Sequence, residues 1–208
     1  MAGNPSHMVV VIHGLGRTSA SMWLLERRLR RWGLQTCRLG YPSTKGGINA
    51  SESYLRTELA GLGPGPLDLV GHSLGGLLSA RLLRDPQGLE IRRVVQLGTP
   101  NLGSPLVDRM GGIWPVRRLC GPAVAELRSH TSRHPPDPRI GAIAGTAGFP
   151  GIPLRRPHDG GVTVRSAWAG AGHRAAIPVL HSALPISSRA AKLTHQFLTN
   201  GRFETPRL

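Results

Sequence analysis

Short apolar runs alternate along this chain with longer segments in which apolar residues recur at helical spacing. Residues 8–12 form a continuous β-branched run, which predicts a strand buried on both faces of a parallel sheet. In residues 19–32, Met22, Leu25 and Leu29 follow a helical repeat, and Gly33 marks the end of the predicted helix. The same reasoning predicts further strands at 34–39, 67–70, 91–97, 140–144 and 177–180, and further helices at 51–62, 74–84 and 188–198.

This alternation of strands and helices predicts the fold class. Strands that are separated by helices form parallel sheets with helices packed on both sides. We therefore expect an α/β protein with a doubly wound, mostly parallel sheet of about six strands and helices on both faces, in a single domain over residues 1–208. Residues 1–7 are expected to be flexible. The irregular region 101–138 is a candidate for a short flap or cap that includes a helix at 123–128, on which Glu126 is expected to be solvated.

The composition is that of a soluble globular protein. Hydrophobic residues make up 39% of the 208 residues, and the 28 glycines bring the total near the usual globular share. The longest stretch without a charged residue or a histidine, Ile140–Leu154, has 15 residues and is interrupted by four glycines and two prolines, so it is too short to cross a bilayer. Because strand-like sequence begins at Met8, we expect no signal peptide and a cytoplasmic location.

The net charge of +15 raises the question of an anionic partner. The basic residues are dispersed apart from a cluster in residues 27–31, which favours a compositional bias toward arginine. Aromatic residues do not interleave with a basic strand, so we expect no specific nucleic-acid partner, whereas weak association with an anionic membrane surface stays open. Cys37 and Cys120 have no neighbouring Cys or His at ligand spacing, so no metal site is predicted; we interpret them as lone buried thiols, with one disulfide as the alternative.

The strongest chemical motif lies between the third predicted strand and its helix, in the run Gly71-His72-Ser73-Leu74-Gly75. It matches the Gly-x-Ser-x-Gly pattern of a nucleophile elbow, in which the serine occupies a strained turn and flanking glycines let strand and helix approach closely. Ser73 is therefore predicted to be a nucleophile. The Leu74 N–H, at the start of the helix, is predicted to stabilise an oxyanion. The alternative is a glycine-rich turn with an incidental serine.

The loop after the first strand supplies a second candidate element. His13-Gly14-Leu15-Gly16 leaves the sheet at its carboxyl edge, where ligands bind in open α/β folds. We predict that the Leu15 N–H is the second oxyanion donor. A rival interpretation takes the two glycines as a dinucleotide-binding turn, with Arg38 after the next strand as an NADP-type residue. That interpretation leaves Ser73 unexplained.

A serine hydroxyl needs a base to remove its proton and a carboxylate to orient that base. Asp159 follows the penultimate predicted strand in a glycine-backed loop and is predicted to be the carboxylate, with Asp137 as the second choice. His181 closes the predicted strand 177–180 and enters a loop, so it is predicted to be the base, with His173 as the alternative. Because a histidine must be neutral to act as a base, activity is expected to fall in acid.

The chain resembles the small bacterial lipase and esterase branch of the α/β-hydrolase superfamily over nearly its whole length. The matching segments are 10–16, 71–76, 97–104, 158–162 and 178–181. The resemblance implies a minimal α/β-hydrolase fold and the hydrolysis of acyl esters through Ser73, Asp159 and His181, with no cofactor. The expected partner is a small-molecule or lipid ester.

The substrate itself is less clearly encoded. An apolar group in the irregular region is a candidate for an acyl groove or a flap, although core packing explains it equally well: Leu102, Leu106, Met110, Ile113 and Trp114. The same three catalytic groups also serve thioesterases and acyltransferases, so both stay open. A noncatalytic binding protein also stays open, because a fold alone does not fix a function.

Overall fold

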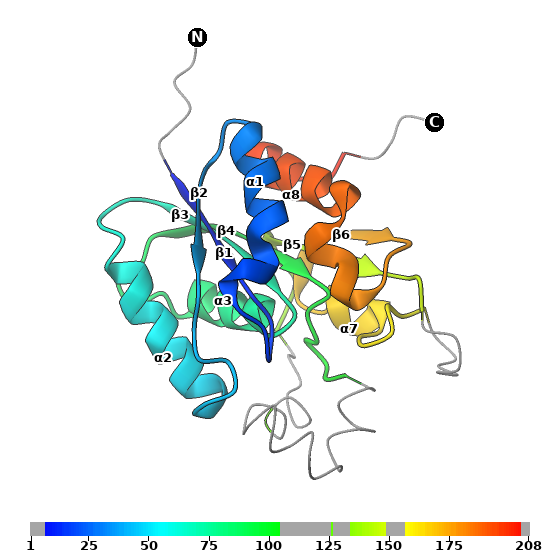
Figure 1. Ribbon diagram of the computed structural model, residues 1–208, viewed down its shortest axis with the longest axis horizontal. Coiled ribbons are helices and arrows are strands. Elements are labelled where there is room, and N and C mark those ends of the chain that lie inside the picture. The colour runs from blue at the N-terminus through cyan, green and yellow to red at the C-terminus, as the bar shows by residue number, and fades with distance from the viewer. Residues whose placement is uncertain (1–6, 105–125, 127–133, 149–156, 205–208) are drawn as a thin grey trace.

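The computed structural model describes residues 7–104, 126, 134–148 and 157–204, and these form a six-stranded sheet with helices around it (Figure 1). The strand order is β2-β1-β3-β4-β5-β6, and every neighbouring pair is parallel. The expected doubly wound parallel sheet is therefore confirmed. The strands are β1 Met8–Ile12, β2 Gln35–Leu39, β3 Leu67–His72, β4 Ile91–Leu97, β5 Asp137–Gly145 and β6 Ala171–Ile177.

Helices cover both faces of this sheet, as the sequence predicts. On one face, α1 (Trp23–Arg31) and α8 (Ser188–Asn200) pack side by side. The other face carries α2 (Gly47–Ala60), α3 (Leu74–Arg84) and the short α7 (Val164–Trp168). Two 3-10 helices, η1 (Ser19–Met22) and η2 (His181–Ile186), lie in the connections. Among the described helices, none combines the length and apolar character that a membrane span requires.

Strand β1 shows why the apolar runs are continuous. Val9 and Val11 pack in the core beneath α1 and α8, whereas Val10 and Ile12 pack in the core beneath α2 and α3. All four side chains are fully buried. Because neighbouring residues on a strand point to opposite faces, a strand covered on both sides needs apolar residues at every position.

The parallel arrangement brings the candidate loops to one edge of the sheet. The loop after β1 contains Leu15, the turn after β3 contains Ser73, and the segments after β5 and β6 lead toward Asp159 and His181. Carboxyl ends of parallel strands meet at the same edge, where ligands bind in open α/β sheets. Residues more than a hundred positions apart can therefore meet there.

Several element boundaries differ from the sequence prediction. The last strand covers Ala171–Ile177 rather than 177–180, and His181 begins η2 instead of closing a strand. Strand β6 is an edge strand whose inner residues, 172–176, are alternately exposed and half-buried between buried ends, and its Ala-, Gly- and Arg-containing sequence lacks the β-branched pattern that marks β1. The helix α7 was not predicted.

Helix α2 begins at Gly47, four residues before the predicted start. Its first turn is capped from far along the chain, because the Ile48 N–H donates to the carboxylate of Glu126 at 2.9 Å. Glu126 is therefore a half-buried helix-capping residue, and the expectation that it is solvated is wrong. The rest of the predicted helix at 123–128 lies outside the described residues.

Part of the positive charge has a structural role. Arg92 binds the fully buried carboxylate of Asp68 at 2.6 Å and also donates to the Leu198 carbonyl of α8. Arg38 pairs with Glu26, and Arg56 pairs with Glu52. These contacts satisfy buried acids and a helix end, so the arginines involved need no external anion.

Candidate active site

Ser73 lies in the sharp turn between β3 and α3. Its φ of 53° and ψ of −118° are rare for a residue with a side chain. The turn is held by backbone hydrogen bonds, because the Ser73 N–H donates to the Leu97 carbonyl at 2.9 Å and the Ser73 carbonyl accepts from the Gly76 N–H at 3.1 Å. A strained residue that its surroundings fix in place is typical of a functional site.

The glycines around Ser73 allow strand and helix to approach each other. A Cβ atom at Gly71 would overlap the backbone of Gly75 and Gly76. A Cβ atom at Gly75 would lie 2.5 Å from the His13 carbonyl oxygen, and one at Gly76 would overlap the hydroxyl of Thr99. Each of these glycines is therefore required because a side chain would clash with neighbouring atoms, and not because its φ and ψ exclude other residues. Together they bring the start of α3 against the loop that follows β1.

Replacing Gly71 with alanine is expected to destabilise the protein by about 3 kcal/mol or more, because its Cβ meets backbone atoms that cannot rotate away. Urea unfolding followed by circular dichroism measures the loss. Gly40→Ala is the matched control, because a Cβ there meets its nearest atom at 3.8 Å, an ordinary contact. That variant is expected to change the free energy of unfolding by less than about 1 kcal/mol. Equal stabilities for the two variants would contradict the steric role of Gly71.

Asp159 and His181 form a direct pair at this edge of the sheet. The Oδ2 atom of Asp159 lies 2.8 Å from Nδ1 of His181, and the His181 N–H donates to the Asp159 carbonyl at 2.8 Å. The other carboxylate oxygen of Asp159 accepts from the N–H groups of Gly161 and Val162, at 2.9 and 2.7 Å. An ionised carboxylate only accepts hydrogen bonds, so Nδ1 of His181 donates and Nε2 keeps its lone pair. This is the tautomer that a general base needs.

Gly98 connects this pair to the serine turn. A Cβ atom on Gly98 would lie 3.0 Å from both Oδ2 of Asp159 and Nδ1 of His181. The preceding residue, Leu97, accepts the hydrogen bond from the Ser73 N–H. The structure therefore brings Ser73, Asp159 and His181 to the same edge of the sheet, and within the described part of the chain no hydrogen bond joins the Ser73 hydroxyl to His181. Gly98 lies in the segment 97–104 that carries the family resemblance, but the sequence analysis assigns it no role in the site.

The predicted oxyanion loop packs against the serine turn. A Cβ on Gly14 would lie 3.1 Å from Cβ of Ser73. The N–H groups of Leu15 and Leu74 donate to no acceptor in the described residues, so both remain available to a ligand. Neither needs a side chain for this role, since each donates through its backbone.

His13 shapes this loop instead of reacting. Its Nδ1 donates to the Gly14 carbonyl at 2.9 Å, and its Nε2 accepts from the Tyr41 N–H at 3.3 Å. The Tyr41 ring stacks on the imidazole with centroids 4.5 Å apart, and its hydroxyl donates to the His13 carbonyl at 3.1 Å. Tyr41 is therefore a supporting residue that the sequence analysis missed. Its place two residues after β2, at the same edge of the sheet, is the one available signal.

The alternative candidates are engaged elsewhere. Asp137 begins β5, at the opposite end of that strand from the site, and its carboxylate pairs with Arg139 at 2.8 Å, which holds the pKa of Asp137 below its ordinary value. His173 lies within β6 with its ring against Phe197. Arg38, the residue that the dinucleotide interpretation needs, pairs with Glu26 at 2.6 Å. None of these three side chains approaches Ser73.

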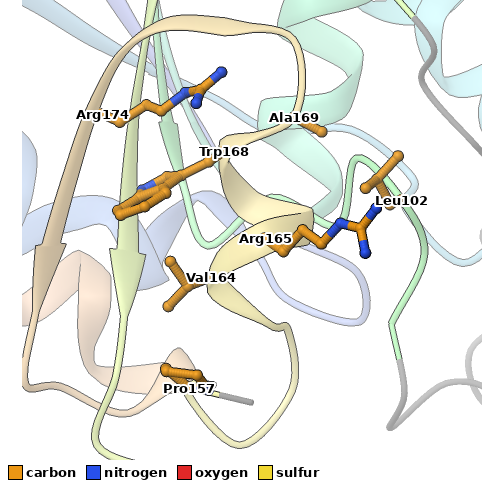
Figure 2. Close-up of a pocket in the computed structure, with 7 residues that line it drawn as sticks. All are labelled: Leu102, Pro157, Val164, Arg165, Trp168, Ala169 and Arg174. Atoms are coloured by element: carbon orange, nitrogen blue, oxygen red, sulfur yellow. The ribbon is translucent and has the colours of Figure 1, made fainter.

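One pocket in the described residues lies beside α7 (Figure 2). It has a volume of about 470 Å³ and is lined by Leu102, Pro157, Val164, Arg165, Trp168, Ala169 and Arg174. Leu102 is thus the one predicted substrate-binding residue that the structure places, since Leu106, Met110, Ile113 and Trp114 lie outside the described residues. Ser73, Asp159 and His181 do not line this pocket. The described residues hold no cluster of three His, Cys, Asp or Glu side chains arranged to bind a metal ion.

The buried imidazoles predict an acid-sensitive fold. Burial lowers the pKa of His13 below its ordinary value of 6.5, and burial together with the charge of His181 lowers the pKa of His72 further. Below about pH 6.5 the unfolded chain binds protons that the folded protein excludes, so the free energy of unfolding falls as the pH decreases. The expected loss is at most about 1.4 kcal/mol per pH unit for each imidazole.

Urea unfolding at about pH 7.5, 6.5 and 5.5 measures this dependence, in a range above that in which most carboxylates titrate. A His72→Gln variant is the control, because it has lost one of the two imidazoles and is expected to show a shallower decline. A free energy of unfolding that stays constant across this range would show that the two buried histidines do not govern acid stability.

Comparisons with known proteins agree with this architecture. No family model matches the sequence, and no curated protein matches it. Among solved structures, the mature lipase BlEst2 of Bacillus licheniformis matches 97% of this chain and 95% of its own, with a TM-score of 0.70 at 18% sequence identity. The RedJ thioesterase of the prodiginine pathway in Streptomyces coelicolor covers 97% of this chain and 94% of its own, with a TM-score of 0.62 at 17% identity.

Alpha/beta hydrolase domain-containing protein 10 from mouse gives a TM-score of 0.62 at 13% identity, over 93% of this chain and 88% of its own. Likeness at such low identity concerns the arrangement of strands and helices rather than the chemistry. The parallel six-stranded sheet, with Ser73 in the turn after β3, agrees with it. The chain therefore has the α/β-hydrolase fold.

Proposed function

We propose that this protein is a serine hydrolase that cleaves carboxylic esters through Ser73, His181 and Asp159. One observation supports this above the others: a carboxylate held by two backbone N–H groups binds Nδ1 of a histidine, at the same edge of the sheet as a strained serine. Structural histidine–carboxylate pairs occur elsewhere in proteins, but they do not require a serine in a left-handed turn next to them.

In the proposed reaction, Nε2 of His181 takes the hydroxyl proton of Ser73 while Oγ attacks the ester carbonyl carbon. The resulting oxyanion accepts hydrogen bonds from the N–H groups of Leu15 and Leu74. The C–O bond of the leaving group then breaks, and the alcohol departs with the proton from His181. Water repeats the sequence on the acyl-enzyme, which releases the acid and restores Ser73. Asp159 orients the imidazole and stabilises its transient positive charge throughout.

Thioester hydrolysis is the second candidate activity. The fold likeness to the RedJ thioesterase favours it, and the same nucleophile, base and oxyanion donors would serve a thiol leaving group. An acyltransferase would use an alcohol or amine in place of water at the deacylation step. Oxygen and sulfur esters of the same acyl chain, compared at equal concentration, separate the two hydrolytic activities.

A fluorophosphonate probe tests the proposal, because it reacts only with an activated serine. The native protein is expected to gain one probe mass, and peptide mapping is expected to place it on Ser73. Protein unfolded in urea is the control and should remain unlabelled, since unfolding separates Ser73 from His181. Absence of labelling in the native protein, together with no hydrolysis of short p-nitrophenyl esters, would overturn the proposal and favour a noncatalytic binding role.

A further inference from the structure

We propose that His72, the residue immediately before the nucleophile, is a positioning residue that holds the base His181 in place through a hydrogen bond to its backbone. The inference rests on the proposed function, because it gives His72 a part in the same reaction. It assigns no proton transfer to His72. The sequence alone marks this residue only as a neighbour of the motif.

The contact itself joins two segments that are 109 positions apart in the chain. The Nε2 atom of His72 lies 3.0 Å from the carbonyl oxygen of His181. The two rings also meet, with centroids 4.9 Å apart and an interplanar angle of 44°. His72 is 1% exposed, so water does not compete for this hydrogen bond. A buried contact of this kind restrains the residue that carries the base.

Besides the contact with His72, the ring of His181 binds the Asp159 carboxylate, and His181 is the first residue of η2. Strand β6 ends at Ile177, four residues earlier, so His181 lies beyond the hydrogen-bonded sheet. Its N–H donates to the Asp159 carbonyl, and its own carbonyl accepts from His72. The backbone of the base is therefore held on one side by the acid loop and on the other by the residue before the nucleophile. Removing the second contact leaves the distance between Ser73 and His181 less well defined.

The protonation state of His72 follows from this geometry. A carbonyl oxygen only accepts, so Nε2 of His72 donates and Nδ1 carries the lone pair. That Nδ1 has no hydrogen-bond partner in the described residues. It faces Gly14, where a Cβ atom would lie 3.0 Å from it. His72 therefore separates the loop that contains Leu15 from the segment that contains His181, and it does not compete with His181 as the base.

Burial and the nearby charges of His181, Arg17 and His13 lower the pKa of His72 well below its ordinary value. The ring consequently stays neutral while His181 gains and loses its proton during the reaction. A permanently neutral imidazole keeps the same donor, Nε2–H, in both states of the base. The hydrogen bond to His181 thus persists through the whole catalytic cycle.

Two variants separate positioning from packing. His72→Leu removes the donor but keeps an apolar side chain of similar size, whereas His72→Gln retains an N–H group that reaches a comparable distance. We expect His72→Leu to lower kcat for a short ester by about 10- to 100-fold with KM within about twofold, since a misplaced base slows the chemical step. His72→Gln is expected to restore most of the lost kcat. Fluorophosphonate labelling rates should fall and recover in parallel.

Urea unfolding of both variants provides the folding control. A His72→Leu variant that folds and keeps kcat within about twofold of the parent would overturn the proposal. Equal losses of kcat in folded His72→Leu and His72→Gln would also overturn it, because the donor would then have no effect.

A measurement on the unaltered protein does not depend on either variant folding. With ¹⁵N-labelled histidine, the two ring nitrogens of His72 are expected to show a proton on Nε2 and none on Nδ1. A proton on Nδ1 would contradict the hydrogen bond to His181. If the native protein neither reacts with the probe nor hydrolyses esters, the proposed function fails while this tautomer measurement still tests the contact.

Discussion

Replacing Ser73 with alanine is expected to lower kcat for a short p-nitrophenyl ester by about four orders of magnitude or more. The change removes only Oγ, the atom that forms the acyl-enzyme in the proposed reaction. The Ser73 side chain makes no hydrogen bond in the described residues, and the turn is held by backbone contacts to Leu97 and Gly76. The free energy of unfolding is therefore expected to change by less than about 1 kcal/mol.

Steady-state hydrolysis and urea unfolding, measured on the same preparation, test both halves of this expectation. Ser182→Ala is the matched control, because Ser182 is exposed and directly follows His181 in the chain. It is expected to keep kcat within about twofold of the parent. A Ser73→Ala enzyme that retained more than about a tenth of the parental kcat would show that another group is the nucleophile.

The features that the sequence predicts well are those with a local cause. Strand β1 is marked by its β-branched run, and α3 begins and ends at the predicted residues, Leu74 and Arg84. The serine turn is marked because close approach of strand and helix requires Gly71 and Gly75 in its immediate neighbourhood. In each case the residues that determine the conformation lie within a few positions of it.

The sequence predicts poorly those elements whose position depends on residues far away in the chain or on their place in the sheet. Helix α2 begins at Gly47 after the N-cap Gly46, and its first turn is capped by Glu126, a contact from far along the chain that the local sequence does not reveal. Strand β6 lies at the sheet edge and its inner residues are only partly covered, so its sequence has no continuous apolar run. An apolar sequence pattern indicates that a segment is buried, and an edge strand made of small residues shows little of this pattern.

The same distinction applies to the candidate site. The sequence of their loops predicts Asp159 as the acid and His181 as the base, but their 2.8 Å contact depends on how β5 and β6 end. The contact between Tyr41 and His13, and that between His72 and His181, join segments that are distant in the chain and leave no local pattern. Supporting residues of this kind become visible only when the sheet places the loops side by side.

Replacing Asp159 with asparagine is expected to lower kcat by about four orders of magnitude through the tautomer of the base. The amide oxygen can keep the hydrogen bonds from the Gly161 and Val162 N–H groups, which leaves the NH₂ group facing Nδ1 of His181. An NH₂ group donates, so Nδ1 must accept and the ring proton moves to Nε2. The nitrogen that should take the proton from Ser73 is then already protonated. The loop geometry is retained, so the loss is expected in kcat while KM changes little.

Asp137→Asn is the control for this variant, because it makes the same chemical change at the acid that ranked second in the sequence. The Asp137 carboxylate pairs with Arg139 at the start of β5, away from Ser73, so its loss is expected to cost at most about 1 kcal/mol of stability and to leave kcat within about twofold. Hydrolysis rates of the two variants, each measured on folded protein, decide between the two acids. A large fall in kcat for Asp137→Asn with full activity in Asp159→Asn would assign the role to Asp137 and remove Asp159 from the proposed mechanism.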